Sequence, residues 1–327
     1  MSRRRVLSGI QPTGAGKHLG NYLGAVRHWA AMQDEFECFY FVADLHSLTI
    51  TPDPAELRQQ VRKLVAELLA MGVDPSRSAL FAQSHIPEHP ELAWVLSCLT
   101  GFGEASRMTQ FKEKGGGNVG LFNYPILQAA DILLYQAHAV PVGEDQRQHL
   151  ELTRDLGQRF NNRYGDAFTV PDPYVQKAAE RIKDLQEPTA KMSTSKGGPG
   201  TLWVIEDDKA TLKKIKSAVT DTGREVVYDV GNKPGVSNLL TILSAATGTP
   251  VPELQTAFEG KGYGDLKGTV ADAVIELFAP VRTRFAELMA DPGYLDEVLA
   301  KGAATARPIA SATMRDVRSR IGLLAPA

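Results

Sequence analysis

Hydrophobic and polar positions follow two different periods along the first half of the chain. Short apolar runs rich in β-branched and aromatic residues occur at residues 4–10, 38–45 and 78–85, and these runs predict strands. The longer segments 22–33 and 53–72 lie between them and repeat apolar side chains at helical spacing. Strands that alternate with helices predict a doubly wound parallel sheet of the α/β class.

The ends of these segments carry signals of their own. Asp53 suits the N-cap of the second helix, and Gly72 is expected to end that helix. In a doubly wound sheet, ligands bind beyond the carboxyl ends of the strands. We therefore expect the binding loops to follow Ile10, Ala43 and Val142.

The pattern changes near residue 206, after which helical spacing dominates and strand-like runs are few. We expect residues 1–205 to form a Rossmann-like domain and residues 206–327 to form a smaller, helical C-terminal domain. The last helix of the chain is expected to pack back on the first domain.

Composition and charge are those of a globular protein. Of the 327 residues, 43% are apolar and 23% are charged, and the formal net charge is -2. Without an overall basic excess, contact with nucleic acid would need a local basic patch. Cys38 and Cys98 lie in apolar runs and are predicted to be buried and to bind no metal. The N-terminus lacks the apolar core of a signal peptide and no apolar stretch reaches membrane length, so we expect a soluble, cytoplasmic protein without membrane contact.

The segment EPTAKMSTSKGGPG, residues 187–200, is a poor helix and a poor strand. Lys191 and Lys196 stand on either side of a row of hydroxyl side chains, and glycines follow. Lysines and hydroxyls on a glycine-rich loop predict a lid that closes on an anion, with phosphate as the first candidate. An ordinary solvated loop is the alternative. The hydroxyl residues are Ser193, Thr194 and Ser195.

A second candidate loop, residues 9–21, joins a predicted strand to a helix, which is where phosphate-binding loops occur. Its glycine spacing fits neither the phosphate-binding loop nor the dinucleotide fingerprint. A nucleotide site of another kind stays open, in which His18 donates to a phosphate oxygen and Gly20 admits an adenine base. The alternative is a helix-entry loop with a surface histidine.

Polar residues form one stripe of the otherwise apolar segment 124–136. Such a stripe indicates either a solvated face or the wall of a pocket. Asp131 would then be an acceptor in apolar surroundings, suited to a single donor on a large apolar ligand. The stripe consists of Tyr124, Gln128, Asp131 and Tyr135.

The segment 140–156 is typical of a strand, a glycine turn and the start of a helix. Glu144 and Asp145 at a helix N-terminus are favourable through the helix dipole alone. In the functional alternative, Asp145 binds a ribose hydroxyl or an amine and Gln146 lies at the mouth of a pocket.

Two lysine-rich segments also have two interpretations. The loop 108–120 carries Lys112 and Lys114 before three glycines, and it is either a second phosphate lid or a flexible surface loop. A later helix is basic on its surface, which fits a solvated face as well as it fits RNA contact. Its lysines are Lys209, Lys213, Lys214 and Lys216.

Taken in order, these segments resemble one family. PTGAGKHLGN resembles the HIGH element of class I aminoacyl-tRNA synthetases, GEDQ the nucleotide motif of their tryptophan and tyrosine branch, and AKMSTS their mobile KMSKS loop. SGIQPTG, SRMTQFKEK, YPILQAADILLY, KKIKSAVTD and KPGVSNLL also occur in the expected order. The similarity covers essentially the whole chain, and the combined pattern resembles the bacterial tryptophanyl-tRNA synthetases.

The resemblance implies a homodimeric enzyme that joins L-tryptophan to the 3′ end of tRNA(Trp) through an adenylate. It implies ATP and Mg2+ as cofactors, with the ion carried by ATP and no dedicated metal site on the protein. It also implies that residues 206–327 contact the tRNA and its anticodon. Because the attacking carboxylate of tryptophan is already ionised at neutral pH, the activation step needs no general base.

The resemblance further implies roles for individual residues. The catalytic set is Lys191, Ser193, Ser195, His18 and Lys112. The nucleotide-contacting set is Gln11, Pro12, Thr13, Gly20, Asn21, Gly143, Glu144, Asp145, Ile182, Lys191, Met192, Ser193, Thr194 and Ser195. The amino-acid set is Asp131 as acceptor of the indole N–H, Tyr124 and Gln146 at the polar end, and Gln128, His46 and Gly9 around the side chain.

Two positions depart from the family pattern. Thr194 stands where the second lysine of the lid usually stands, so one charge contact to phosphate is missing unless Lys196 supplies it. Gln128 stands where many relatives have methionine. Two alternatives therefore stay open. One is a tyrosyl-tRNA synthetase, since a phenol O–H could also donate to a buried aspartate, and the other is a non-catalytic paralogue that binds RNA or a protein partner.

Overall fold

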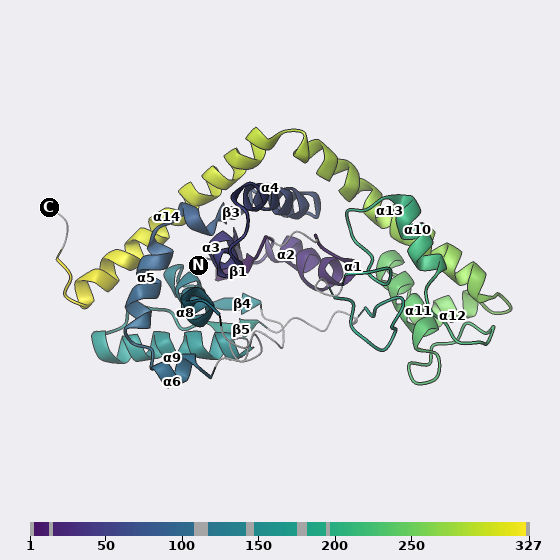
Figure 1. Cartoon of the computed structure of the whole chain (residues 1–327), viewed down its shortest axis with the longest axis horizontal. Coiled ribbons are helices and arrows are strands. Elements are labelled where there is room, and N and C mark those ends of the chain that lie inside the picture. Colours follow the sequence, from purple (N-terminus) through teal and green to yellow (C-terminus); the bar gives the residue numbers. More distant parts are fainter. Residues whose placement is uncertain are drawn as a thin grey trace.

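The structure, a computed structural model, describes residues 3–12, 16–107, 117–141, 147–174, 182–193 and 197–324. A parallel sheet lies near the centre of the molecule, with strand order β3-β2-β1-β4-β5 (Figure 1). The order reverses between β1 and β4, so their carboxyl ends border the crevice where ligands bind in doubly wound folds. The strands are β1(Arg5–Ile10), β2(Glu37–Val42), β3(Ser78–Ala82), β4(Ala139–Pro141) and β5(Asp172–Tyr174).

Side chains that alternate along β2 enter two cores, one on each face of the sheet. Cys38 and Tyr40 belong to one core, whereas Phe39 and Phe41 belong to the other. The helix α4(Pro54–Ala70) contributes to the first core, and α5(Glu88–Ser97), α8(Val119–Leu134) and α9(Arg147–Tyr164) contribute to the second. The predicted doubly wound α/β fold is confirmed.

Short helical segments lie between these strands and helices. They are α1(Leu19–Asn21), the π-helical η1(Tyr22–Val26), α2(Arg27–Met32), α3(Asp44–Ser47), the 3-10 turns η2(Leu48–Ile50) and η3(Gln83–His85), and α6(Phe102–Ala105).

The end signals predicted for the helix at residues 53–72 are confirmed in α4. The Asp53 carboxylate accepts hydrogen bonds from the backbone N–H groups of Ala55 and Glu56, and Gly72 adopts a left-handed φ of 106° just after the helix. The polar stripe lies on α8, which begins at Val119 rather than within the predicted segment, because the Asn118 side chain caps it by accepting from the Leu121 N–H.

The second half of the described chain is helical, as predicted. Its helices are α10(Asp208–Lys216), α11(Pro234–Thr247), α12(Val251–Ala257), α13(Tyr263–Met289) and α14(Pro292–Arg320). The last two form a long arch over the molecule (Figure 1). Along this arch α13 packs against α10, α11 and α4, and α14 packs against β3. The division of the chain at residue 205 stays a prediction.

The prediction that both cysteines are buried is wrong for Cys98. Cys38 lies in the core, but Cys98 is exposed at the C-terminal end of α5. It stands four residues after Trp94, which is 72% exposed, so the two share the outer face of that helix. The apolar run that contains Trp94 and Cys98 is therefore buried only in part. None of the helices in the described part of the chain is both long enough and apolar enough to span a membrane.

Candidate functional site

His18 begins the helical segment that follows the first loop, and its ring is held in one tautomer. Its Nδ1 atom accepts from the backbone N–H of Asn21 at 3.2 Å, while the Asn21 Oδ1 atom accepts from the backbone N–H of His18 at 3.1 Å. Burial, together with the charges of Lys191 and Lys17, lowers the pKa of His18 to about 4. The ring is therefore neutral at pH 7, and its proton lies on Nε2 as a donor.

A residue of the predicted lid pairs with a residue that precedes the lid. The Met192 N–H donates to the Ile182 carbonyl at 3.3 Å, and both side chains are almost fully buried. A Cβ atom on Gly20 would stand 3.1 Å from the His18 ring and 3.9 Å from the Ile182 side chain. The structure thus brings together Gly20, His18 and the strand-like pair Ile182–Met192, which the sequence assigned to one nucleotide site.

Lys191 is exposed next to this cluster, and its charge acts on the His18 ring. Ser193 follows it and is half-buried. Gln11 is exposed and Pro12 is buried just beyond the carboxyl end of β1. This end of the sheet therefore combines a cation with a neutral imidazole donor, a pair suited to phosphate oxygens.

A buried carboxylate lies next to Gly16 of the first loop. Glu67 of α4 is 2% exposed, and its Oε1 atom lies 3.9 Å from the Lys63 Nζ atom. A Cβ atom on Gly16 would stand 3.1 Å from that oxygen, and Gly16 has a left-handed φ of 75°. Burial raises the pKa of Glu67, while Lys17 and Lys63 oppose the rise. Gly16 thus lies beside the carboxylate of Glu67, which interacts with the charges of Lys17 and Lys63.

Asp131 lies at the centre of a buried polar cluster and is 1% exposed. Its Oδ1 atom accepts from Gln83 Nε2 at 2.7 Å and lies 2.6 Å from His89 Nδ1. Its Oδ2 atom lies 2.9 Å from His46 Nε2. Burial alone would raise the pKa of Asp131, but the hydrogen bonds from His46 and His89 lower it to about 2. The carboxylate therefore stays ionised inside the protein.

The expectation of apolar surroundings for Asp131 is wrong. Three polar side chains contact its carboxylate, and they come from three other segments: α3, the turn after β3, and α5. The polar stripe is not a solvated face, because Asp131 and Tyr135 are fully buried and Tyr124 and Gln128 are half-buried. The stripe runs from the protein interior toward its surface.

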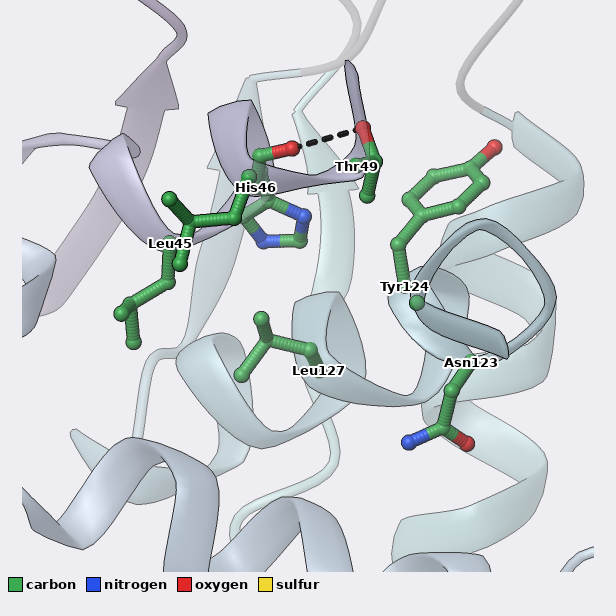
Figure 2. Close-up of a pocket in the computed structure, with 8 residues that line it drawn as sticks. Leu45, His46, Thr49, Asn123, Tyr124 and Leu127 are labelled. Atoms are coloured by element: carbon green, nitrogen blue, oxygen red, sulfur yellow. Dashed lines mark hydrogen bonds between the residues drawn. The ribbon is translucent and has the colours of Figure 1, made fainter. Parts of the chain in front are cut away.

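A pocket of about 160 Å³ lies beside this cluster, between α3, η2 and the N-terminal half of α8 (Figure 2). His46 and Tyr124 point into it and Leu127 closes it from below. The Tyr124 hydroxyl lies 3.0 Å from His149 Nε2, and its ring meets His46 edge to face. His46 thus both lines the pocket and contacts the buried carboxylate of Asp131.

Gly9 is exposed in β1, but the direction that a side chain would take there is occupied. A Cβ atom at Gly9 would stand 2.3 Å from the ring of Phe41 on the neighbouring strand. Several predicted site residues lie outside the described part of the chain. They are Thr13, Lys112, Gly143, Glu144, Asp145, Gln146, Thr194 and Ser195.

Sequence reasoning missed three buried residues of the site, Gln83, His89 and His149. Gln83 lies within the third predicted strand, residues 78–85, which in the structure already ends at Ala82, and His89 comes shortly after it. We expected binding loops only after Ile10, Ala43 and Val142. Ligands in doubly wound sheets bind beyond the carboxyl ends of the strands, and this rule, if applied to the third strand as well, would have indicated this segment.

Three comparisons with known proteins agree. Residues 1–279 match the family model described as tRNA synthetases class I (W and Y). The tryptophan–tRNA ligase 2 of Streptomyces avermitilis is 56% identical over 98% of both chains, and the tryptophan–tRNA ligase of Corynebacterium glutamicum is 55% identical over 98% of this chain and 95% of its own.

Among solved structures, the tryptophanyl-tRNA synthetase of Campylobacter jejuni complexed with ADP and tryptophan is 36% identical, with a TM-score of 0.87. The match covers 98% of this chain and all of that one. The sequence relatives and the solved structure match nearly the full length, and the family model matches residues 1–279. The chain therefore belongs to the class I tRNA synthetases of the tryptophan and tyrosine group.

Proposed function

We propose that the protein is a tryptophan–tRNA ligase. It activates L-tryptophan with ATP, forming tryptophanyl-adenylate and pyrophosphate, and then transfers the tryptophanyl group to the 3′ end of tRNA(Trp). The relatives that span nearly the whole chain carry this name, and the chain is 56% identical to one of them. The proposal places the reaction in the cytoplasm.

The choice of amino acid rests on Asp131. A carboxylate that stays ionised although it is 1% exposed is a strong acceptor in a place where water cannot compete. An indole N–H would pair with it, whereas the phenylalanine ring has no donor to offer. A site built around such a pair rejects the analogue without the donor by roughly 10⁴ to 10⁵.

Activation then depends on position and charge. A carboxylate oxygen of tryptophan attacks the α-phosphorus of ATP, the bond from that phosphorus to the bridging oxygen breaks, and pyrophosphate leaves with its electron pair. His18 Nε2–H and the Lys191 ammonium would stabilise the charge that develops on the phosphate oxygens. Because the ring of His18 is neutral, it acts as a hydrogen-bond donor without giving up its proton.

The lid role stays with residues Lys191 and Ser193, helped by the glycines after them. Mg2+ is proposed to arrive bound to ATP. Among the residues that the structure describes, no group of three His, Cys, Asp or Glu side chains is placed to hold a metal ion. The triphosphate itself would supply the hard oxygen ligands that Mg2+ prefers.

We further propose a homodimer, supported by apolar surface around α8. Trp94 of α5, Phe102 of α6 and Val119 of α8 are 72%, 79% and 81% exposed. Phe102 stacks on Phe122 of α8, with 5.2 Å between the ring centroids, and α5 also packs on α8. Large apolar side chains exposed on neighbouring elements are typical of a subunit interface.

The deciding experiment is ATP–pyrophosphate exchange with tryptophan, tyrosine and phenylalanine supplied separately at equal concentration. Exchange with tryptophan alone supports the proposal. Exchange with tyrosine alone would instead identify a tyrosyl-tRNA synthetase. No exchange with any of the three would favour the non-catalytic RNA- or partner-binding alternative.

A further inference from the structure

The hydrogen bonds around Asp131 are unequally divided between its two oxygens. A carboxylate offers about four acceptor positions, two on each oxygen. Gln83 and His89 both point at Oδ1, at 2.7 and 2.6 Å, whereas within the described part of the chain Oδ2 has one partner, His46, at 2.9 Å. Oδ1 is therefore saturated, and one acceptor position is left on Oδ2.

The proton positions support this count. Tyr135 has its hydroxyl 2.7 Å from His89 Nε2, and burial raises the pKa of that phenol, so it keeps its proton. The phenol O–H donates to Nε2, which leaves the His89 ring proton on Nδ1, facing Asp131. The Gln83 amide must present its nitrogen to Asp131, because its oxygen would otherwise face a carboxylate oxygen.

Oδ2 is the oxygen whose partner lines the pocket. His46, which pairs with Oδ2, is one of the pocket residues, whereas Gln83 and His89, which pair with Oδ1, are 0% exposed and are not among them. A ligand donor that reaches Asp131 beside His46 therefore meets Oδ2. Gln83 and His89 therefore determine which oxygen of Asp131 is available to a ligand.

We propose that Gln83 and His89 are positioning residues for amino-acid selection, which saturate Oδ1 of Asp131 and leave Oδ2 as the acceptor for one N–H group of the substrate side chain. This inference rests on the proposed tryptophan activation. It predicts that selection depends on a donor at the Nδ1 position of residue 89, and not only on the volume of the imidazole.

The test compares L-tryptophan with L-3-benzothienylalanine, in which sulfur replaces the indole N–H. The ratio of their kcat/KM values in ATP–pyrophosphate exchange measures recognition of that N–H. His89→Asn keeps an N–H near the Nδ1 position, whereas His89→Gln places its amide near the Nε2 position. His85→Gln, which changes an exposed histidine close by in the chain, is the matched control.

We expect His89→Gln to lower the ratio about tenfold to a hundredfold, the scale of one lost hydrogen bond to a charged group. His89→Asn should keep the ratio within about threefold of the unaltered protein, since it retains that bond. Gln83→Met, which keeps the side-chain volume, should lower the ratio as His89→Gln does. The KM for ATP should not change in any of the folded variants, whose thermal unfolding is measured in parallel.

The inference is overturned if His89→Gln and Gln83→Met keep the original ratio, or if His89→Asn loses it as fully as His89→Gln. Gln83→Met tests it independently if a residue 89 variant does not fold. A different result, in which the unaltered protein does not exchange with tryptophan, would instead refute the proposed function.

Discussion

Gly302 of α14 lies directly on the backbone of Leu80 in β3. A Cβ atom at residue 302 would stand 1.9 Å from the Leu80 carbonyl oxygen and 2.8 Å from its nitrogen. No real Cβ atom comes this close, and β3, although it is an edge strand, is paired with β2 along its whole length and has little room to move aside. The close approach of the last helix to the sheet therefore depends on a glycine at this position.

Gly302→Ala should lower the free energy of unfolding by about 1–3 kcal/mol or more, because α14 must move away from β3. The gain in helix propensity, about 1 kcal/mol, offsets only part of this. Gly268→Ala in α13 is the control, since a Cβ atom there meets nothing within 4 Å. That variant should gain stability in urea unfolding. Equal stability of both variants would contradict the close contact.

Lys191→Ala should reduce tryptophan-dependent ATP–pyrophosphate exchange about a hundredfold or more, the effect of removing one donor that stabilises transition-state charge. Lys213→Ala is a suitable control, because it removes an exposed lysine from α10, away from the cluster around His18. The reduction should appear in kcat. A normal kcat for the Lys191 variant would remove this residue from the catalytic set.

The depressed pKa of His18 predicts a pH-dependent stability. The folded chain keeps the ring neutral down to about pH 4, whereas the unfolded chain takes up a proton below about 6.5. Between these values the unfolded state binds more protons, so stability falls as pH falls, by at most about 1.4 kcal/mol per pH unit. Urea unfolding at several pH values should show a smaller fall for His18→Gln than for His85→Gln.

Asp131→Ala should reduce the preference for tryptophan over phenylalanine far more than it weakens ATP binding. The substitution removes the ionised acceptor and leaves His46 and His89 without their shared partner. The preference is measured as the ratio of kcat/KM values in ATP–pyrophosphate exchange, and ATP binding as its KM. An unchanged preference for tryptophan would refute the assignment of Asp131.

Replacing Trp94 and Phe102 by glutamate and lysine should shift the protein from a dimer to a monomer, because it places charges on an apolar interface. Light scattering during gel filtration measures the mass of each form. Val227→Glu, at a residue that is 42% exposed in the helical half of the chain, controls for the loss of an exposed apolar side chain. If the double variant keeps the mass of the original protein, the subunit interface does not lie at these two residues.

Elements that depend on local physics could be predicted from the sequence. Apolar periodicity predicted the first three strands, and the cap at Asp53 and the left-handed Gly72 marked the ends of α4, because such signals act within one turn. The parallel sheet followed from the alternation of strands and helices. The stripe on α8 was also visible, since residues three and four apart share a helix face.

The surroundings of that stripe depend on tertiary packing, which the sequence pattern did not predict. The donors to Asp131 lie 85, 48 and 42 residues away along the chain, at His46, Gln83 and His89. Local spacing carries no information about such neighbours, so an aspartate flanked by alanines and leucines was expected in apolar surroundings. The sheet brings the ends of separate strands to one edge, and packing there determines which groups meet, which carboxylate stays charged and which of its oxygens is left for a ligand.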